Sequence, residues 1–353
     1  ISGIVLILFF SQITTAQYKD WQYSGSLYIL TTPEGADLPE SASVSDFPLL
    51  IRLNTDCFNF SQAMAGGDDI RFSGASGAPL FYNIEEWDSS KGTASIWVRI
   101  PNIRGNTIQE IKMYWGKPGA KSESSGKAVF NESNGYLSVF HMNDPVSDVT
   151  GTVTSKNMGT TSTAGIIGKA AHLDEGQGID CGDNITSYPV GSNPSTTEAW
   201  VRSKKPNVTI LGWGNDERAG KVVMQFVSPP KIRMDCYRSD ANVSGKSKLS
   251  MDQWIHVVHT CRNGDSRIYV NGREDGISTI VKNPLSVKSP SAMQIGGWMS
   301  EFLFDGDIDE VRISNVVRSA DWIRLQYENQ KQLNTLVGPL VSEGSNFSVS
   351  HTK

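Results

Sequence analysis

The chain has 353 residues, enough for two domains of ordinary size, each able to bury a hydrophobic core. Hydrophobic residues make up 38% and charged residues 20%, a balance typical of globular proteins, which argues against a disordered chain. The formal net charge of −5 comes without a basic stripe, which argues against nucleic-acid partners and against broad binding to an anionic membrane surface.

The start of the chain predicts a signal peptide over residues 1–17. An apolar run from Ile4 to Phe10 is followed by polar and then small residues, which places the cleavage near Ala16 or Gln17. A buried strand is the alternative, and the run is too short to cross a bilayer, which needs about 20 apolar residues. Because an initiator Met and a basic segment are missing, we expect a truncated start. We expect the mature protein to be exported: secreted, periplasmic or on the outer surface.

Residues 18–121 predict a β-sandwich module. Period-two alternation is clear in Leu80–Trp87, Ala94–Ile100 and Ile108–Trp115, and Phe47–Leu53 reads as a further strand. Short strands separated by turn signals every ~8–12 residues, without convincing helical periodicity, are typical of a sandwich.

An ordered set of motifs in this module is similar to a known bacterial family. GGDDIRF is followed by Pro-Leu-x-Tyr, then by Ala-x-Ile-Trp-Val-x-Ile-Pro, and finally by Tyr-Trp-Gly. From about Trp21 to Lys121 the chain therefore resembles the domain of unknown function 2341. The resemblance implies a type of module and no activity. The polar stretch SESSGKAVFNESNG that follows, residues 122–135, predicts a flexible linker.

Residues 136–335 predict a second β module. Two apolar strands, WIHVVHTC and RIYV, flank the Asn263-Gly264 turn, and Asn271-Gly272 ends this hairpin. Asn-Gly favours the positive φ angles of tight hairpin turns. A single helix is predicted at Ser319–Gln330, with Ser319 as its cap.

Two longer motifs of this module are WIHVVHTCRNGDSRIYVNG and FDGDIDEVRISNVVRSADWIRLQYENQ. On these motifs the second module resembles the laminin-G-like, concanavalin A-like jelly-roll superfamily. Members are mostly two-sheet antiparallel sandwiches that bind glycans or proteins, and some coordinate calcium. The predicted fold class is therefore all-β: two antiparallel β-sandwich domains, the second a concanavalin A-like jelly roll, with one short C-terminal helix. Residues 336–353 are expected to be a tail that leads to a further fused module.

The four cysteines are too few and too scattered for a disulfide scaffold, and no CxxC spacing indicates zinc. In an exported protein one disulfide is the natural expectation, and Cys236–Cys261 is our choice because both residues lie on predicted strands of one module. The alternative is that the thiols are buried as small hydrophobic groups.

No catalytic residues are predicted. Jelly-roll glucanases place a Glu-x-Asp-x-x-Glu string on one strand so that its carboxylates face a common groove, and this string does not occur here. The nearest acidic cluster contains Asp305, Asp307 and Asp309. Alternation puts Asp309 on the core side with Val311, where hydrogen bonds to backbone N–H groups are the leading interpretation. A calcium site at these three residues is the alternative.

Glycan binding remains as a hypothesis. Trp213 and Trp298 lie at glycine-flanked strand ends where a ring can be displayed to a sugar, and Tyr237 and Arg238 border another loop. The alternative is that the two tryptophans cover the edge of the sandwich.

The sequence thus predicts a non-catalytic carbohydrate-binding or adhesion protein whose partner is a glycan or another cell-surface polymer. Two alternatives stay open: a structural or protein-interaction spacer of a larger envelope protein, and a glycoside hydrolase whose site is assembled from dispersed residues.

Overall fold

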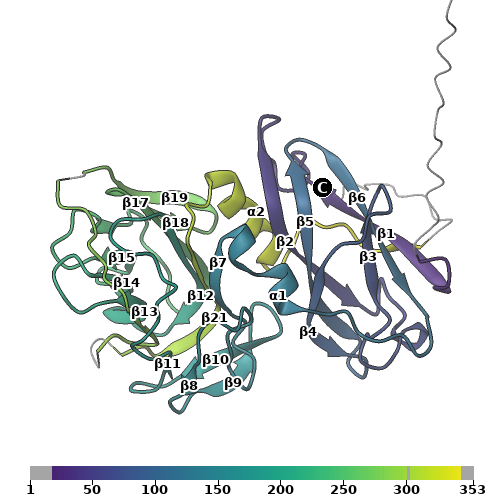
Figure 1. Cartoon of the computed structure of the whole chain (residues 1–353), viewed down its shortest axis with the longest axis horizontal. Coiled ribbons are helices and arrows are strands. Elements are labelled where there is room, and N and C mark those ends of the chain that lie inside the picture. The colour runs from purple at the N-terminus through teal and green to yellow at the C-terminus, as the bar shows by residue number, and fades with distance from the viewer. Residues whose placement is uncertain (1–17, 281, 300–302, 343–353) are drawn as a thin grey trace, which may run out of the picture.

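The computed structural model describes residues 18–280, 282–299 and 303–342 (Figure 1). The predicted signal peptide lies outside the described residues, and so do residues 343–353 of the predicted tail. Two antiparallel β-sandwiches stand side by side, which confirms the predicted all-β class. Among the described residues, neither of the helices has the length and hydropathy of a transmembrane span.

The first sandwich has two sheets, with the strand orders β22-β1-β6-β3 and β2-β5-β4. Ile96 and Val98 of β5 are fully buried in its core, as the alternation predicts. Trp97, which points to the opposite face, is fully buried as well because the second sandwich covers that face. The strands are β1 (Tyr23–Leu30), β2 (Ser43–Asn54), β3 (Arg71–Gly74), β4 (Tyr82–Asp88), β5 (Thr93–Arg104), β6 (Ile108–Trp115) and β22 (Val341–Ser342), with a 3-10 turn η1 (Phe60–Gln62).

The second sandwich also has two sheets. The strand order of one is β19-β18-β17-β12-β21-β10-β9, and β7 pairs with β21 beside this order. The strand order of the other is β16-β15-β14-β13-β20-β11-β8. Its strands are β7 (Tyr136–Phe140), β8 (Lys156–Asn157), β9 (Thr161–Ala164), β10 (Lys169–Leu173), β11 (Ile179–Asp180), β12 (Ser195–Ser203), β13 (Val208–Gly214), β14 (Lys221–Val227), β15 (Lys231–Asp235), β16 (Val243–Ser244), β17 (Ile255–Arg262), β18 (Asp265–Val270), β19 (Arg273–Ser278), β20 (Ala292–Ile295) and β21 (Gly306–Ser314).

The two Asn-Gly turns of this sandwich form as predicted. The φ angles are 50° and 84° at Asn263 and Gly264, and 49° and 76° at Asn271 and Gly272. Two successive positive φ angles match the right-handed twist of the flanking strands, which explains the tight β17–β18 and β18–β19 connections.

Residues 122–135 connect the sandwiches but are not an extended linker. They form a short helix α1 (Gly126–Val129) and a 3-10 turn η2 (Glu132–Asn134), capped by the side chains of Ser125 and Asn131. Val129 and Phe130 are fully buried between the sandwiches. The apolar pair inside a polar stretch therefore anchors the connection, and this local order differs from the expected flexibility.

The predicted C-terminal helix is α2 (Ala320–Gln330), and the Ser319 hydroxyl accepts a hydrogen bond from the N–H of Trp322, as predicted for a cap. After α2 the chain returns to the first sandwich. Leu336 and Leu340 are buried there, and β22 pairs with β1. The described part of the expected tail, residues 336–342, thus belongs to the first sandwich.

Helix α2 lies between the two sandwiches, beside β2 (Figure 1). Because β2 is the edge of its sheet, its outer backbone groups need partners. The Asn329 side chain supplies them: its Oδ1 accepts from the Leu50 N–H at 2.6 Å, and its Nδ2 donates to the Leu50 carbonyl at 2.9 Å. Arg52 donates to the carbonyls of Asn329 and Gln330 at the end of the helix.

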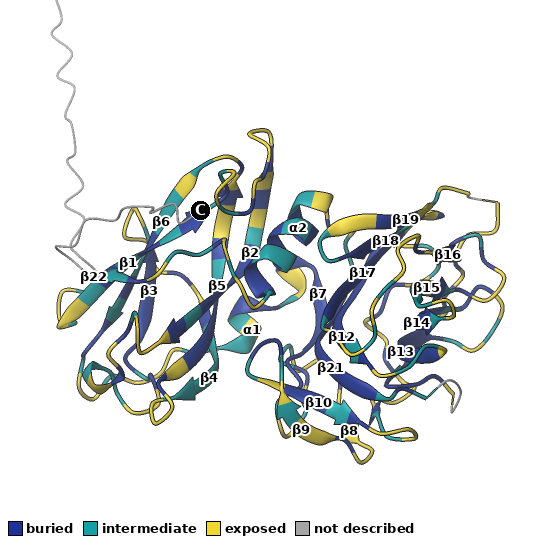
Figure 2. Ribbon diagram, turned by 180° about the vertical axis from the view of Figure 1, so that it is seen from behind, coloured by how far each residue is buried: buried dark blue, intermediate teal, exposed yellow. Residues whose placement is uncertain are grey.

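The junction of the sandwiches is buried throughout. Figure 2 shows β7, β12 and β21 almost entirely in the colour of buried residues. Apolar side chains of both sandwiches, among them Phe47, Trp97, Trp200 and Trp322, form one continuous cluster. The two modules therefore share a core in addition to having their own.

We expect Asn329→Ala to lower the free energy of unfolding by about 2–4 kcal/mol, because it leaves the buried N–H and carbonyl of Leu50 without partners. Urea denaturation at constant pH measures this. Asn193→Ala is the matched control, since Asn193 is exposed and should change stability by less than about 0.5 kcal/mol. Equal effects of the two substitutions would contradict the role of Asn329.

Candidate functional site

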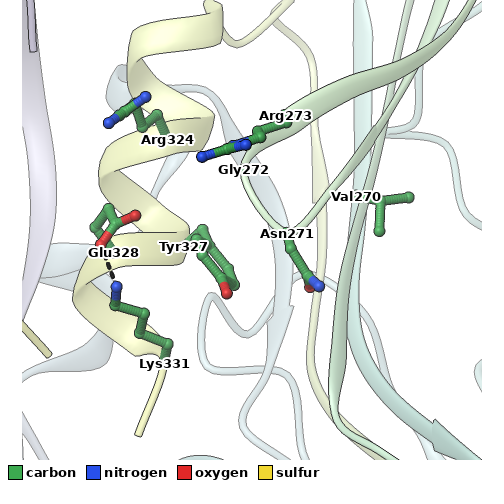
Figure 3. A pocket seen from close by; sticks show the side chains of 8 residues that line it. All are labelled: Val270, Asn271, Gly272, Arg273, Arg324, Tyr327, Glu328 and Lys331. Carbon is green, nitrogen blue, oxygen red and sulfur yellow. Dashed lines mark ion pairs between the residues drawn. The ribbon is translucent and has the colours of Figure 1, made fainter. Parts of the chain in front are cut away.

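A groove follows one side of α2, where the helix passes the ends of β12, β17 and the β18–β19 hairpin. Two adjoining hollows, with cavity volumes of ≈ 380 Å³ and ≈ 320 Å³, make up this α2 groove, and Tyr327 and Lys331 line both. Sites for small ligands typically have ~300–1,000 Å³, so the α2 groove has the size of a binding site. Figure 3 shows the larger hollow, between α2 and the Asn271–Gly272 turn.

The smaller hollow has aromatic walls. It is lined by Trp200, Trp254 and Tyr327, and the Trp200 and Tyr327 rings stack at 5.8 Å with 20° between their planes. Trp254 and Tyr327 are half-buried, so part of each ring faces the groove, whereas Trp200 is buried. The guanidinium of Arg202 lies 5.4 Å from the centre of the Trp254 ring.

Polar groups surround these rings. Asp252, Gln253 and Gln332 are exposed at the smaller hollow, and Asn271 and Arg273 lie at the larger one. Flat apolar rings beside hydrogen-bonding side chains are the combination that holds a sugar by its apolar face and reads its hydroxyl groups.

The close packing of the hairpin turn against α2 depends on a glycine. A Cβ at Gly272 would lie 3.0 Å from the Cβ of Tyr327, and the φ of Gly272 is +76°. Both the contact and the backbone conformation favour glycine at this position. The turn that was predicted from Asn271-Gly272 therefore also shapes the wall of the groove.

The four ligand-binding residues predicted from sequence lie elsewhere. Trp213 is in the core between the sheets, where its Nε1 donates to the Thr197 hydroxyl at 2.9 Å. The expectation that its ring is displayed is wrong, because the strand points it inward. Trp298 is also buried: its ring covers Gly212, which has no side chain to keep the ring away.

Tyr237 and Arg238 are exposed, as expected for residues that border a loop. Lys221 connects this surface to Trp298: its Nζ lies 5.3 Å from the Tyr237 ring centre and 2.9 Å from the Asp216 carboxylate, which accepts a hydrogen bond from Trp298. Tyr237, Arg238 and Trp298 thus gather around the β13–β14 loop.

The three aspartates predicted as a candidate calcium site are already engaged. Asp305 pairs with Lys204 at 3.1 Å, and Asp307 pairs with both Arg202 and His172. Asp309 accepts hydrogen bonds from the N–H groups of Ile166, Ile167 and Glu310 at 2.9, 3.1 and 2.8 Å. Cationic groups and N–H donors surround these carboxylates, so the residues do not fit a calcium ion.

The backbone-capping interpretation of Asp309 is confirmed, but its predicted face is wrong. Val311 lies in the core between the sheets, whereas Asp309 points to the opposite side, toward the first sandwich. The reason is a β-bulge against β12 at Glu310, which has a φ of 50°. One extra residue reverses the alternation along the strand.

The expected Cys236–Cys261 disulfide is not present. Both thiols are free and buried in the core between the two sheets. Burial raises the pKa of Cys261 to about 11, so its thiol is protonated at neutral pH. These cysteines act as small hydrophobic side chains, which was the alternative interpretation.

Sequence reasoning missed a buried ionic cluster at the junction of the sandwiches. Glu85 of the first sandwich lies beside His141 and Glu310 of the second, with candidate ligand atoms within 4.8 Å of one another. The His141 Nδ1 is 2.7 Å from a Glu310 oxygen and 3.4 Å from a Glu85 oxygen. Arg312 binds the other Glu310 oxygen, and its guanidinium lies 4.7 Å from the Trp97 ring centre.

This cluster has the ligand types of a metal site, yet its members already have partners within the protein. His141 Nδ1 lies between the Glu85 and Glu310 carboxyl groups, the indole N–H of Trp97 donates to Glu85 at 2.5 Å, and Arg312 neutralises Glu310. The Glu85 and Glu310 side chains are fully enclosed, so neither can contact a polymer. The junction cluster is therefore an interface contact.

The environment shifts the pKa values of this cluster in opposite directions. Burial raises the pKa of Glu85 to about 8, against the opposing charge of His141. Burial alone would lower the pKa of His141, but Glu310 and Glu85 outweigh it and the pKa is raised. Burial would raise the pKa of Glu310, but the charges of His141 and Arg312 hold it below its usual value.

Comparisons with known proteins confirm both resemblances drawn from the sequence. Residues 174–324 match the concanavalin A-like lectin/glucanases superfamily, and residues 66–142 match a domain of unknown function, DUF2341. No curated protein matches the chain.

Two solved structures are similar to parts of the chain. Domain 4 of an extracellular arabinanase from Geobacillus stearothermophilus, in complex with arabinotriose, is 21% identical with a TM-score of 0.44, over 54% of this chain and 97% of that chain. The binding domain of Paraclostridial Mosquitocidal Protein 1 is 12% identical with a TM-score of 0.45, over 55% of this chain and 52% of that chain.

The junction cluster predicts how stability depends on pH. Folded Glu85 and His141 keep protons that the unfolded chain releases, so their contribution to stability is lost as the pH rises toward about 8. Glu310 stays ionised when folded, so its contribution is lost as the pH falls below 4.5. Because Glu85 and Glu310 share one unfolded pKa and are shifted in opposite directions, we expect the contribution of this cluster to be largest near pH 4.5 and to fall on either side, measured as the free energy of unfolding in urea.

Glu85→Gln should flatten the alkaline side of this profile, because the amide stays neutral and still accepts from Trp97. Glu86→Gln is the matched control: the neighbouring Glu86 is partly exposed and should leave the profile unchanged. A Glu85→Gln profile parallel to that of the wild type would contradict the assignment.

Proposed function

We propose that this protein is a non-catalytic, extracellular carbohydrate-binding module that attaches to a glycan through the α2 groove. The observation that carries the proposal is the pair of half-buried rings, Trp254 and Tyr327, at a hollow of ≈ 320 Å³ with polar side chains around it. The match of residues 174–324 to a lectin/glucanase superfamily supports the same class of ligand. The predicted signal peptide supports the extracellular location.

One of the two carboxylates that line the α2 groove is already ion-paired, which supports binding without hydrolysis. Glycoside hydrolysis needs two carboxyl groups on either side of one glycosidic bond, ~5–10 Å apart. In the α2 groove, Asp252 lines the smaller hollow and Glu328 the larger one, where Glu328 is paired with Lys331 at 2.5 Å. Glu85 and Glu310 are enclosed in the junction cluster.

The rival surface around the β13–β14 loop offers less to a sugar. Of its two aromatic side chains, Trp298 is buried, and Tyr237 is exposed beside Lys221 and Arg238. A single exposed ring presents a smaller aromatic contact area than the two half-buried rings of the α2 groove. We therefore place the glycan at the α2 groove.

We expect the full chain to bind one or more members of a panel of immobilised polysaccharides, and Trp254→Ala to weaken that binding at least about tenfold, or about 1.4 kcal/mol. The lost interaction is the stacking of the indole on a sugar ring. Phe81→Ala is the matched control, because Phe81 is a 64% exposed aromatic residue of the first sandwich. Circular dichroism confirms that each variant is folded.

Tyr237→Ala in the same assay tests the rival surface, and a loss of binding there instead would move the site to the β13–β14 loop. A chelator should leave binding unchanged, because the predicted calcium ligands are held by other groups. Folded protein that binds no polysaccharide would contradict the proposed function, and release of reducing sugar would contradict its non-catalytic character.

A further inference from the structure

Cationic side chains outnumber carboxylates in the lining of the α2 groove, although the whole protein is acidic. Four cationic side chains line the groove, Arg202, Arg273, Arg324 and Lys331, against two carboxylates, Asp252 and Glu328. The complete chain, in contrast, has a net charge of −5. A cation of this lining that has no carboxylate partner would favour an anionic ligand, because field lines concentrate in a concave site.

Three of these cations have carboxylate partners. Arg202 pairs with Asp307 at 2.7 Å, Lys331 with Glu328 at 2.5 Å, and Arg324 with Asp37 at 3.1 Å. These ion pairs fix the side chains in place around the groove and neutralise them, so a charge available to a ligand has to come from the fourth cation.

Arg273 differs from the other three. It is exposed, and among the described residues its guanidinium has no ion-pair or hydrogen-bond partner. It is the first residue of β19, directly after the Asn271–Gly272 turn that packs against Tyr327. Figure 3 shows its side chain extending from the hairpin toward α2, on the side where Arg324 and Tyr327 lie. The most available donor of the larger hollow is therefore an arginine whose planar fork suits a carboxylate or a sulfate ester.

The two hollows can serve one ligand. Tyr327 and Lys331 line both of them. A polysaccharide chain with one sugar stacked beside Trp254 can therefore continue directly into the hollow that contains Arg273. A polysaccharide with an acidic group on a neighbouring unit would place its sugar face on the aromatic wall and its negative charge near the guanidinium.

We propose that the α2 groove recognises an acidic polysaccharide, with the smaller hollow holding a sugar ring and Arg273 in the larger hollow binding its carboxylate or sulfate ester. This inference rests on the proposed function, because it names the ligand class of the same site. It adds a specificity that aromatic stacking alone does not give, since rings hold neutral and acidic sugars alike.

The test compares charged and neutral forms of the same polymers. The full chain is titrated with polygalacturonate and with its methyl ester, and with a sulfated galactan and its desulfated form, at low and moderate salt. We expect at least about tenfold tighter binding of one acidic polymer over its neutral partner, and a preference that shrinks as salt rises. If polygalacturonate binds more tightly than the sulfated galactan, the recognised group is a carboxylate, and the reverse order identifies a sulfate ester.

Arg273→Gln should remove most of the preference and leave binding of the neutral polymers unchanged. Arg262→Gln is the matched control, because Arg262 is an exposed arginine of β17 outside the groove and should have no effect. Trp254→Ala should weaken binding of acidic and neutral polymers together. Sodium sulfate and sodium chloride at equal ionic strength should compete equally.

Each failure has a distinct signature. Equal affinity for acidic and neutral polymers, or no effect of Arg273→Gln, would overturn the acidic ligand class while the proposed function stands. If sodium sulfate competes much more strongly than sodium chloride at equal ionic strength, the groove binds a free anion, and the proposal of a polymeric ligand is overturned. Absence of binding to every polymer by folded protein would overturn the proposed function itself, and with it this inference.

Discussion

The two hydrogen bonds between the Asn329 side chain and the backbone of Leu50 fix α2 to the edge of the first sandwich. An edge strand buried without partners would lose backbone hydrogen bonds, so the helix that covers β2 must present an amide there. Arg52 completes the attachment at the last turn of the helix. The other side of α2 then meets the second sandwich, and the groove exists only because both contacts hold the helix in one place.

The ionic cluster at the junction supplies specificity to the same interface. Bringing Glu85, His141, Glu310 and Arg312 out of water is costly, and such clusters often add little net stability over an apolar interface. Their value lies in the arrangement, since Glu85 of one sandwich meets His141 of the other in this relative position. Trp97 takes part twice, donating to Glu85 and lying beneath Arg312. The modules are therefore joined as one body, and a ligand in the groove would be held by this joined structure.

Rigidity of this kind suits a binding groove. A sugar makes weak individual contacts, and a site whose rings are already oriented loses less entropy on binding. Trp200 stacks on Tyr327 and donates to Gln330 at 2.6 Å, which fixes the aromatic wall from behind. The Asn271–Gly272 turn closes the groove from the side of the second sandwich. Segments distant in the chain therefore build the site together, and none of them carries a recognisable motif for it.

Features that depend on neighbouring residues could be predicted from the sequence: strand alternation, the Asn-Gly turns, the Ser319 cap, and with them the all-β class and the two modules. The sequence did not determine what covers each outer face, because alternation separates the two faces of a strand without naming the partner of either. Trp97 is buried by the other sandwich, Asp309 changes face through a bulge, and Trp213 points inward. The groove and the junction cluster were decided by tertiary structure alone, because their side chains come from distant segments that meet only when the sandwiches pack.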